Sequence, residues 1–226
     1  MTERLATWVW VGASALALVA GMVNVVGYLG FEHQAITHLT GTTTLLGAAL
    51  AGGDGHAAWQ LAAMLLAFVG GAMLSGLLVQ DSVLRLGRRY GVALAIEAVL
   101  LALAVPLFSR GSFAGPLLAA VAIGLQNAMA TTYSGAIIRT SHVSGMFTDL
   151  GITLGHALRG LPVARRRLWL CLVIITSFLA GGVLGAVAFA SLDYRALYLP
   201  AAVTGTTGLT YAVWKHRTLR PGRGDA

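Results

Sequence analysis

Charged side chains are scarce in this sequence: only 10% of its 226 residues are charged, whereas 57% are hydrophobic. A water-soluble domain carries about 25% charged residues. The charges present here are therefore too few to cover a surface that faces water, and no hydrophilic stretch is long enough to form a separate catalytic domain. These absences exclude a soluble enzyme and predict a single membrane domain over residues 1–226.

Cysteine is almost absent as well. Cys171 is the only one and lies in an apolar run, so an intramolecular disulfide is excluded. The sequence has neither His-x-x-x-His nor a cysteine cluster, and Glu32 with His33 makes a weak set of ligands. We expect no metal and no cofactor. Because no nucleophile–base pair or His-Glu-x-x-His segment appears, we also expect that the protein is not an enzyme.

The positive net charge of +7 does not indicate a nucleic-acid partner. The basic residues lie in short segments between apolar runs, at 85–89 and 159–167 and in a tail at 215–226, as is typical of membrane proteins. Since cytoplasmic loops are rich in Lys and Arg, these segments predict that both arginine loops and both termini lie in the cytoplasm.

Six apolar runs are long enough to cross a bilayer, which takes roughly 20 residues. They cover residues 8–29, 57–79, 90–108, 116–138, 168–190 and 196–214. Two shorter runs, 41–51 and 145–158, would extend only about 16 to 21 Å as helices, less than the roughly 30 Å hydrocarbon core. We expect both to re-enter the membrane as half-helices. If they crossed fully instead, the two arginine loops would lie on opposite faces.

The two halves of the sequence resemble each other. Residues 21–24 (Gly-Met-Val-Asn) match residues 124–127 (Gly-Leu-Gln-Asn). Residues 37–41 (Thr-His-Leu-Thr-Gly) match residues 141–145 (Ser-His-Val-Ser-Gly) in nearly the same register. A shared His followed by a hydroxyl residue and Gly, at a shared distance from Asn, favours an internal repeat over chance similarity.

These observations predict an all-α integral membrane fold. Six transmembrane helices and two short re-entrant half-helices would form two three-helix units, approximately 5–108 and 112–214. Because each unit crosses the membrane an odd number of times, the second would be inverted relative to the first. Inverted repeats with short or interrupted helices are typical of transporters and channels, whose binding sites lie near the middle of the membrane.

Residues 27–29 (Gly-Tyr-Leu), 39–47 (Leu-Thr-Gly-Thr-Thr-Thr-Leu-Leu-Gly), 124–128 (Gly-Leu-Gln-Asn-Ala) and 139–145 (Arg-Thr-Ser-His-Val-Ser-Gly) carry a family resemblance. Through them, most of the chain resembles the YoaK-like family of uncharacterised bacterial membrane proteins. The resemblance implies six helices and a bacterial cytoplasmic (inner) membrane location, but no particular activity. Family members typically have Thr-Gly-Asn in the first half, where this chain has Thr-Gly-Thr at residues 40–42.

Polar residues gather at the starts of the two short runs. The first N–H groups of a helix have no partner within it and carry partial positive charge. With Thr40 as the expected N-cap of the first short helix, both helix starts would aim these donors at one central spot. Such a spot suits a solute that is anionic, carboxylate-bearing or small and polar. The expected solute-binding residues are Asn24, His38, Thr40, Gly41, Thr44, Asn127, His142, Ser144, Gly145 and Thr148.

Hydroxyl residues recur at helical spacing in both halves, which predicts a polar face on each short helix. The residues are Thr37, Thr40 and Thr44, then Ser141, Ser144 and Thr148. Two such faces would line one small cavity of a transporter or channel. The alternative is a scaffold or sensor without transport, in which hydroxyl residues and asparagines only join helices.

Two acidic residues are candidates for proton coupling. Glu97 lies in the middle of an apolar run, and Asp149 lies one turn into the second short helix. Acids inside the membrane mark functional positions and favour the protonated form. Arg139 could pair with Asp149, although a side chain reaching out to the cytoplasmic headgroups is the alternative.

Glycines form small-residue stripes on two of the long runs, and such stripes are typical of helix packing. We expect the packing within one chain or between subunits of a homo-oligomer. The glycines are Gly70, Gly71, Gly76, Gly181, Gly182 and Gly185.

Overall fold

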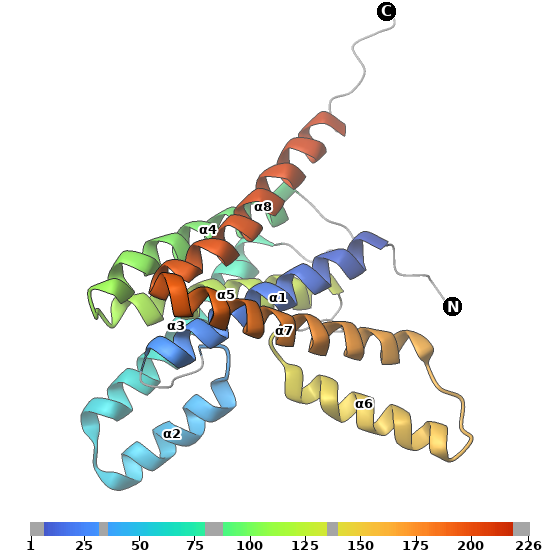
Figure 1. Ribbon diagram of the computed structural model, residues 1–226, viewed down its shortest axis with the longest axis horizontal. Coiled ribbons are helices and arrows are strands. Elements are labelled where there is room, and N and C mark those ends of the chain that lie inside the picture. The colour runs from blue at the N-terminus through green and yellow to red at the C-terminus, as the bar shows by residue number, and fades with distance from the viewer. Residues whose placement is uncertain (1–6, 32–35, 80–87, 135–139, 219–226) are drawn as a thin grey trace, which may run out of the picture.

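The computed structural model describes residues 7–31, 36–79, 88–134 and 140–218, and within this part of the chain every regular element is a helix, without a strand (Figure 1). The long helices are α1 (Thr7–Gly30), α3 (Gly55–Leu78), α4 (Arg88–Ser109), α5 (Ala114–Ser134), α7 (Arg165–Leu192) and α8 (Tyr198–Thr218). The short helices are α2 (Leu39–Gly52) and α6 (Val143–Leu158), and the 3-10 turn η1 (Asp193–Leu197) joins α7 to α8. The expectations for Glu32, His33, Arg139, Arg85 of the first arginine loop and the end of the basic tail concern residues outside the described ranges, whereas Arg88 and Arg89 of that loop begin α4.

Five stretches are long and apolar enough to cross a membrane, judged by length and composition. They are Val9–Gly30, Gly55–Leu78, Arg89–Ser109, Ala114–Thr132 and Arg165–Tyr211. The last has 47 residues and includes α7, η1 and α8. The prediction of a helical membrane protein that crosses the bilayer several times is supported at this level.

The two short helices have the lengths that the sequence suggested. With 14 residues, α2 extends about 21 Å, and with 16 residues α6 extends about 24 Å. Both fall short of the roughly 30 Å hydrocarbon core. Each begins within two residues of its predicted start.

Glycines in the left-handed conformation end both short helices. Gly53 (φ 72°) follows α2, and Gly160 (φ 69°) follows α6. Gly tolerates this backbone conformation because it has no Cβ. The side chain of Asp54 then caps α3 by accepting a hydrogen bond from the Ala57 N–H at 3.0 Å. Each short helix therefore turns back and packs against the long helix that follows it, α2 on α3 and α6 on α7.

The long helices of the two halves pack against each other. Helix α1 packs mainly on α7, α5 packs on α3 and α4, and α4 packs on α8. Figure 1 shows α1 (dark blue) crossing α7 (orange) near the centre of the molecule. In the repeat, α1 matches α5 and α3 matches α7, so the pairs α1–α7 and α5–α3 correspond to each other.

Glycines bring the backbones of these two pairs into direct contact. A Cβ on Gly181 would overlap the carbonyl oxygen of Leu18, and a Cβ on Gly71 would overlap that of Val121. The facing helices have glycines at the same crossings. A Cβ on Gly21 of α1 would overlap the carbonyl oxygen of residue 178 on α7, and a Cβ on Gly124 of α5 would overlap that of residue 68 on α3. Only small residues permit such an approach. The expectation of packing is thus confirmed for Gly71 and Gly181.

The neighbouring glycines of the same stripes differ. A Cβ on Gly185 would contact the Met22 backbone, so this glycine also packs on α1. By contrast, a Cβ on Gly70, Gly76 or Gly182 would meet nothing within 4 Å among the described residues. Of the two alternatives, packing within the chain therefore does not hold for these three among the described residues, and packing between subunits stays a prediction.

Candidate functional site

Asn24 ties the chain before α2 to helix α1. Its side-chain Oδ1 accepts hydrogen bonds from the backbone N–H of Thr37 at 3.0 Å and from the Thr37 hydroxyl at 2.7 Å. Thr37 is buried although it lies outside any helix. Asn24 therefore fixes the path of the backbone immediately before α2 begins.

Asn127 does the same for α6 in the second half. Its Oδ1 accepts from the Thr140 hydroxyl at 2.9 Å and from the Ser141 N–H at 3.2 Å, and its Nδ2 donates to the Ser141 hydroxyl. The two asparagines occupy matched positions and bind matched segments. We call each Asn with its bonded hydroxyl residues an asparagine clasp: Asn24 with Thr37, and Asn127 with Thr140 and Ser141.

Histidines occupy the N-cap positions of both short helices. His38 precedes α2 and His142 precedes α6, and neither side chain caps its helix. The carbonyl of His38 accepts the hydrogen bond from the Thr42 N–H at 3.1 Å. The prediction that Thr40 is the N-cap is therefore wrong. The clasp holds the backbone at Thr37, so the first helical bond already forms at His38.

Each histidine ring lies over the glycine of its helix start. A Cβ on Gly41 would overlap Cδ2 of His38, and a Cβ on Gly145 would overlap Nδ1 of His142. Both rings are exposed. The glycines thus leave room for an imidazole beside the first N–H groups of each helix.

The three hydroxyl residues predicted to form one polar face in each half fall into two groups. Thr37 and Ser141 precede their helices and belong to the asparagine clasps, so the prediction of three hydroxyls on one helical face is wrong. The other hydroxyl residues are exposed on the first turns. The Thr44 hydroxyl donates to its own helix at the Thr40 carbonyl (2.9 Å), and Thr148 does so at the Ser144 carbonyl (3.0 Å).

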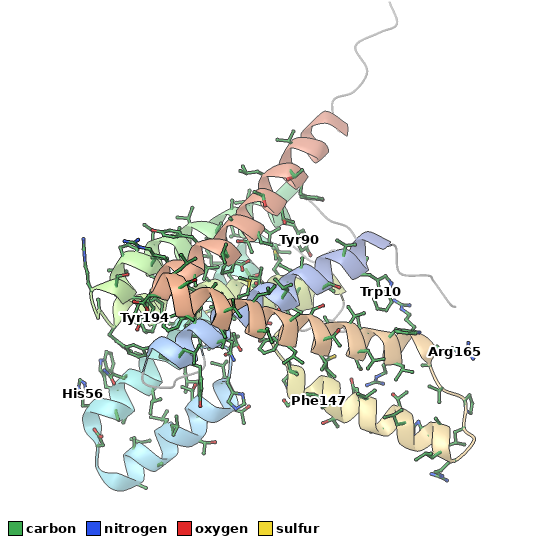
Figure 2. The ribbon with its side chains drawn as sticks, in the orientation of Figure 1. Trp10, His56, Tyr90, Phe147, Arg165 and Tyr194 are labelled. Atoms are coloured by element: carbon green, nitrogen blue, oxygen red, sulfur yellow. The ribbon has the colours of Figure 1, made fainter. Side chains whose placement is uncertain are left out.

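The two helix starts lie toward the middle of the view, and the helices diverge from there. Figure 1 shows α2 (light blue) and α6 (yellow) running outward in different directions. In Figure 2, His56 and Arg165 mark the outer turns of the α2–α3 and α6–α7 hairpins, and Phe147 lies near the start of α6. As described, α2 and α6 do not pack on each other. Convergence of Gly41 and Gly145 on one solute stays a prediction.

The structure separates the two acidic candidates. Asp149 forms an ion pair with Arg167, with Oδ1 and the guanidinium nitrogen 2.8 Å apart, which joins α6 to α7. The partner considered from the sequence, Arg139, lies outside the described residues. Glu97 is fully buried on α4, and neither of its carboxyl oxygens has a hydrogen-bond partner in the described chain. Helix α4 packs on neither short helix.

Gln126 was not among the residues predicted from the sequence to form the site. This side chain is fully buried on α5, and its Nε2 donates to the Leu16 carbonyl of α1 and to the Thr140 hydroxyl, each at 2.9 Å. The matched positions in the first half hold Val23 and Ile36, both buried. The alignment of the two halves contained a signal for this contact. The polar residues Gln126 and Thr140 occupy the positions at which the first half has the apolar residues Val23 and Ile36.

Comparison with known proteins identifies the family of the chain. No match was found among curated proteins or among solved structures. One family model, described as "Protein of unknown function (DUF1275)", matches residues 12–210, which is most of the chain. The YoaK-like resemblance is consistent with this match. The chain therefore belongs to the DUF1275 family.

Proposed function

We propose that this protein is a small-molecule transporter or channel whose solute binds at the starts of α2 and α6. One observation carries the proposal: the same polar arrangement occurs twice, at matched positions. In each half an asparagine clasp fixes a short helix whose start exposes a histidine and a hydroxyl residue beside a glycine. A packing role alone would not require these first turns to be exposed and polar.

Six crossings are the topology that the helices support best. A single helix of 47 residues would extend about 70 Å, more than twice the hydrocarbon core. The turn η1 interrupts this stretch with Asp193 and Arg195, and α8 packs on α4. We therefore take α7 and α8 as two crossings. With α2 and α6 as re-entrant half-helices, the chain crosses six times.

The pairing of helices supports an inverted repeat. The backbone contacts α1–α7 and α5–α3 correspond under the sequence match, and so do the two asparagine clasps. Three crossings in each unit would give the units opposite orientations. The two short helices would then enter from opposite faces and point their N-termini toward the middle of the membrane, as in transporters with interrupted helices.

The chemistry of the helix starts favours a negatively charged or hydrogen-bond-accepting solute. Donor N–H groups at a helix N-terminus stabilise an anion by roughly 1 kcal/mol per terminus. Thr40 and Ser144 add hydroxyls, and His38 and His142 add ring N–H groups. The solute class that fits is anionic, carboxylate-bearing or small and polar. The YoaK-like resemblance supports a bacterial cytoplasmic membrane location.

One observation favours the second candidate, a membrane scaffold or sensor that transports nothing. The hydroxyls of Thr44 and Thr148 bond to their own helix backbones, as they would if they only stabilised helices. Transport would be absent in that case, although the fold would be the same.

Flux through proteoliposomes separates the two candidates. Purified protein should carry at least one member of a panel of labelled small carboxylates, inorganic anions and neutral polar solutes across the vesicle membrane. Protein-free vesicles are the control. If folded protein carries no member of the panel faster than the control vesicles do, the scaffold or sensor is the better conclusion.

Accessibility of single cysteines tests the topology. Replacing Cys171 with Ser removes the only native thiol, after which Ser82→Cys, Ala164→Cys and Ser112→Cys each report one loop. We expect Ser82→Cys and Ala164→Cys to react with a membrane-impermeant maleimide from the cytoplasmic side, and Ser112→Cys from the opposite side. Labelling of Ser82→Cys and Ala164→Cys from different sides would show that the proposed topology is wrong.

A further inference from the structure

Glu97 is the centre of a buried stripe on α4. The residues at helical spacing around it, Tyr90, Ala93, Leu101 and Ala104, are all buried. The part of the stripe before Glu97 belongs to one hydrophobic cluster, and the part after it belongs to a second cluster. A carboxyl group with no described hydrogen-bond partner thus interrupts an otherwise apolar core. Such a group is costly unless something satisfies it.

Gln126 presents an unsatisfied oxygen on the neighbouring helix. Both described donations of its Nε2, to the Leu16 carbonyl and the Thr140 hydroxyl, fix the orientation of the amide. The amide oxygen Oε1 is buried and has no described partner. An amide oxygen only accepts hydrogen bonds, so this atom requires a donor.

Glu97 and Gln126 lie at the same depth in the membrane. Helices α4 and α5 are consecutive and antiparallel, and at their turn Gly115 packs against the backbone N of Phe108. Glu97 precedes Phe108 by as many residues as Gln126 follows Gly115. Because both helices rise by about 1.5 Å per residue, the two side chains start at one level.

The buried faces of the two helices point the same way. Ala122 and Ile123 of α5 share a hydrophobic cluster with Leu101 of α4, and Met129 of α5 shares the other cluster with Ala93 of α4. Glu97 lies between the two clusters along α4. Along α5 the cluster of Leu101 ends at Ile123 and the cluster of Ala93 begins at Leu125, so Gln126 directly follows this boundary. Both side chains therefore enter the same part of the core.

We propose that the proton of the neutral Glu97 carboxyl is donated to Oε1 of Gln126, forming a proton site in the middle of the bundle. Both groups can only accept hydrogen bonds when Glu97 is ionised, so a proton between them satisfies both. This proton is a coupling ion for transport. The coupling role rests on the proposed function, whereas the proton site itself does not.

No charged partner competes for Glu97 on the helices around it. Among the described residues of α1 and α5, none is charged. The ionisable residues on the elements that pack against α4 lie toward the ends of those elements: His56 on α3, Tyr133 on α5, Asp193, Tyr194 and Arg195 on η1, and Tyr198, Tyr211, Lys215, His216 and Arg217 on α8. Without a nearby cation, an ionised Glu97 would carry the full cost of a charge inside the membrane.

The acceptor side of the site, Gln126 with its partner Thr140, has no polar counterpart in the first half. The positions that match Gln126 and Thr140 hold Val23 and Ile36, which pack together in one hydrophobic cluster. The protein would thus have one proton site in addition to its two matched helix starts. One coupling proton for each transported solute would account for this difference between the halves.

Infrared difference spectroscopy of the intact protein in liposomes tests the site. We expect a carbonyl stretching band of a protonated carboxyl at neutral pH that is lost in Glu97→Gln. In Gln126→Leu the band should move to higher wavenumber, because the carboxyl loses its acceptor. Thr140→Val, which removes only a partner of Nε2, should leave the band close to its wild-type position.

The outcomes separate this inference from the proposed function. A wild-type spectrum without the Glu97 band, or a band unmoved in Gln126→Leu, would overturn the proton site even if solute flux is found. If Gln126→Leu does not fold, Gln126→Asn shortens the side chain by one carbon and should move the band likewise. Loss of the band on adding Na⁺ at constant pH would mean that the site holds a metal cation, which also contradicts the proposal. A band that behaves as expected supports the site, even where no flux is detected.

Discussion

Gly71→Ala and Gly181→Ala should each destabilise the protein by about 1–3 kcal/mol or more, the cost of overpacking a tight core. The added methyl group would overlap a backbone carbonyl oxygen of the facing helix, that of Val121 for Gly71 and that of Leu18 for Gly181. A backbone carbonyl inside a helix cannot rotate away, so the two helices must separate. Thermal unfolding of the purified protein in detergent, followed by loss of the monodisperse size-exclusion peak, measures the effect.

The chain offers a matched control beside each of these glycines. Gly70→Ala and Gly182→Ala place the same methyl group one residue away, where nothing described lies within 4 Å. These variants should be neutral or slightly stabilising, because Ala is the better helix former by about 1 kcal/mol. Equal loss of stability in all four variants would contradict the idea that backbone contact at the crossings holds the halves together.

Gly41→Leu and Gly145→Leu should abolish solute flux while the protein remains folded. In each case the new side chain takes the space of a histidine ring over the first turn of a short helix and covers the N–H donors there. Because both rings are exposed, displacing them should cost little folding stability. Flux in proteoliposomes, normalised to the amount of folded protein, measures the loss, which we expect to reach the protein-free background.

Leucine at matched positions further along the same helices provides the control. A Cβ on Gly47 or Gly151 would meet nothing described within 4 Å, and both glycines are exposed. Gly47→Leu and Gly151→Leu should therefore retain most of the flux. Undiminished flux in both Gly41→Leu and Gly145→Leu would show that the helix starts do not lie on the transport path.

The sequence predicted the helices well because hydropathy and length decide them. Predicted runs at 57–79 and 90–108 correspond to α3 and α4 with differences of one or two residues at the ends. The short helices were predicted from their length alone. The pairing of α1 with α7 could not be predicted in this way, because periodicity shows which face is buried but not which helix covers it.

The sequence indicated most residues of the candidate site, but it did not indicate the hydrogen bonds and ion pair that these residues form. The repeat matched Asn24 with Asn127 but did not predict their hydrogen bonds to the segments before α2 and α6, since the path of a loop is not set by helical periodicity. Thr40 was assigned as a cap for the same reason. Similarly, Arg167 meets Asp149 only because α6 folds back on α7, which requires the turn at Gly160.

The exchange of long helices between the halves has a consequence for biosynthesis. When the first half has entered the membrane, α1 and α3 expose to lipid the glycines whose partners are α7 and α5. These contacts form only after the later helices leave the ribosome and the translocon. The newly made first half must therefore stay inserted without its main tertiary contacts, so chaperones and proteases of the membrane would meet it in that state.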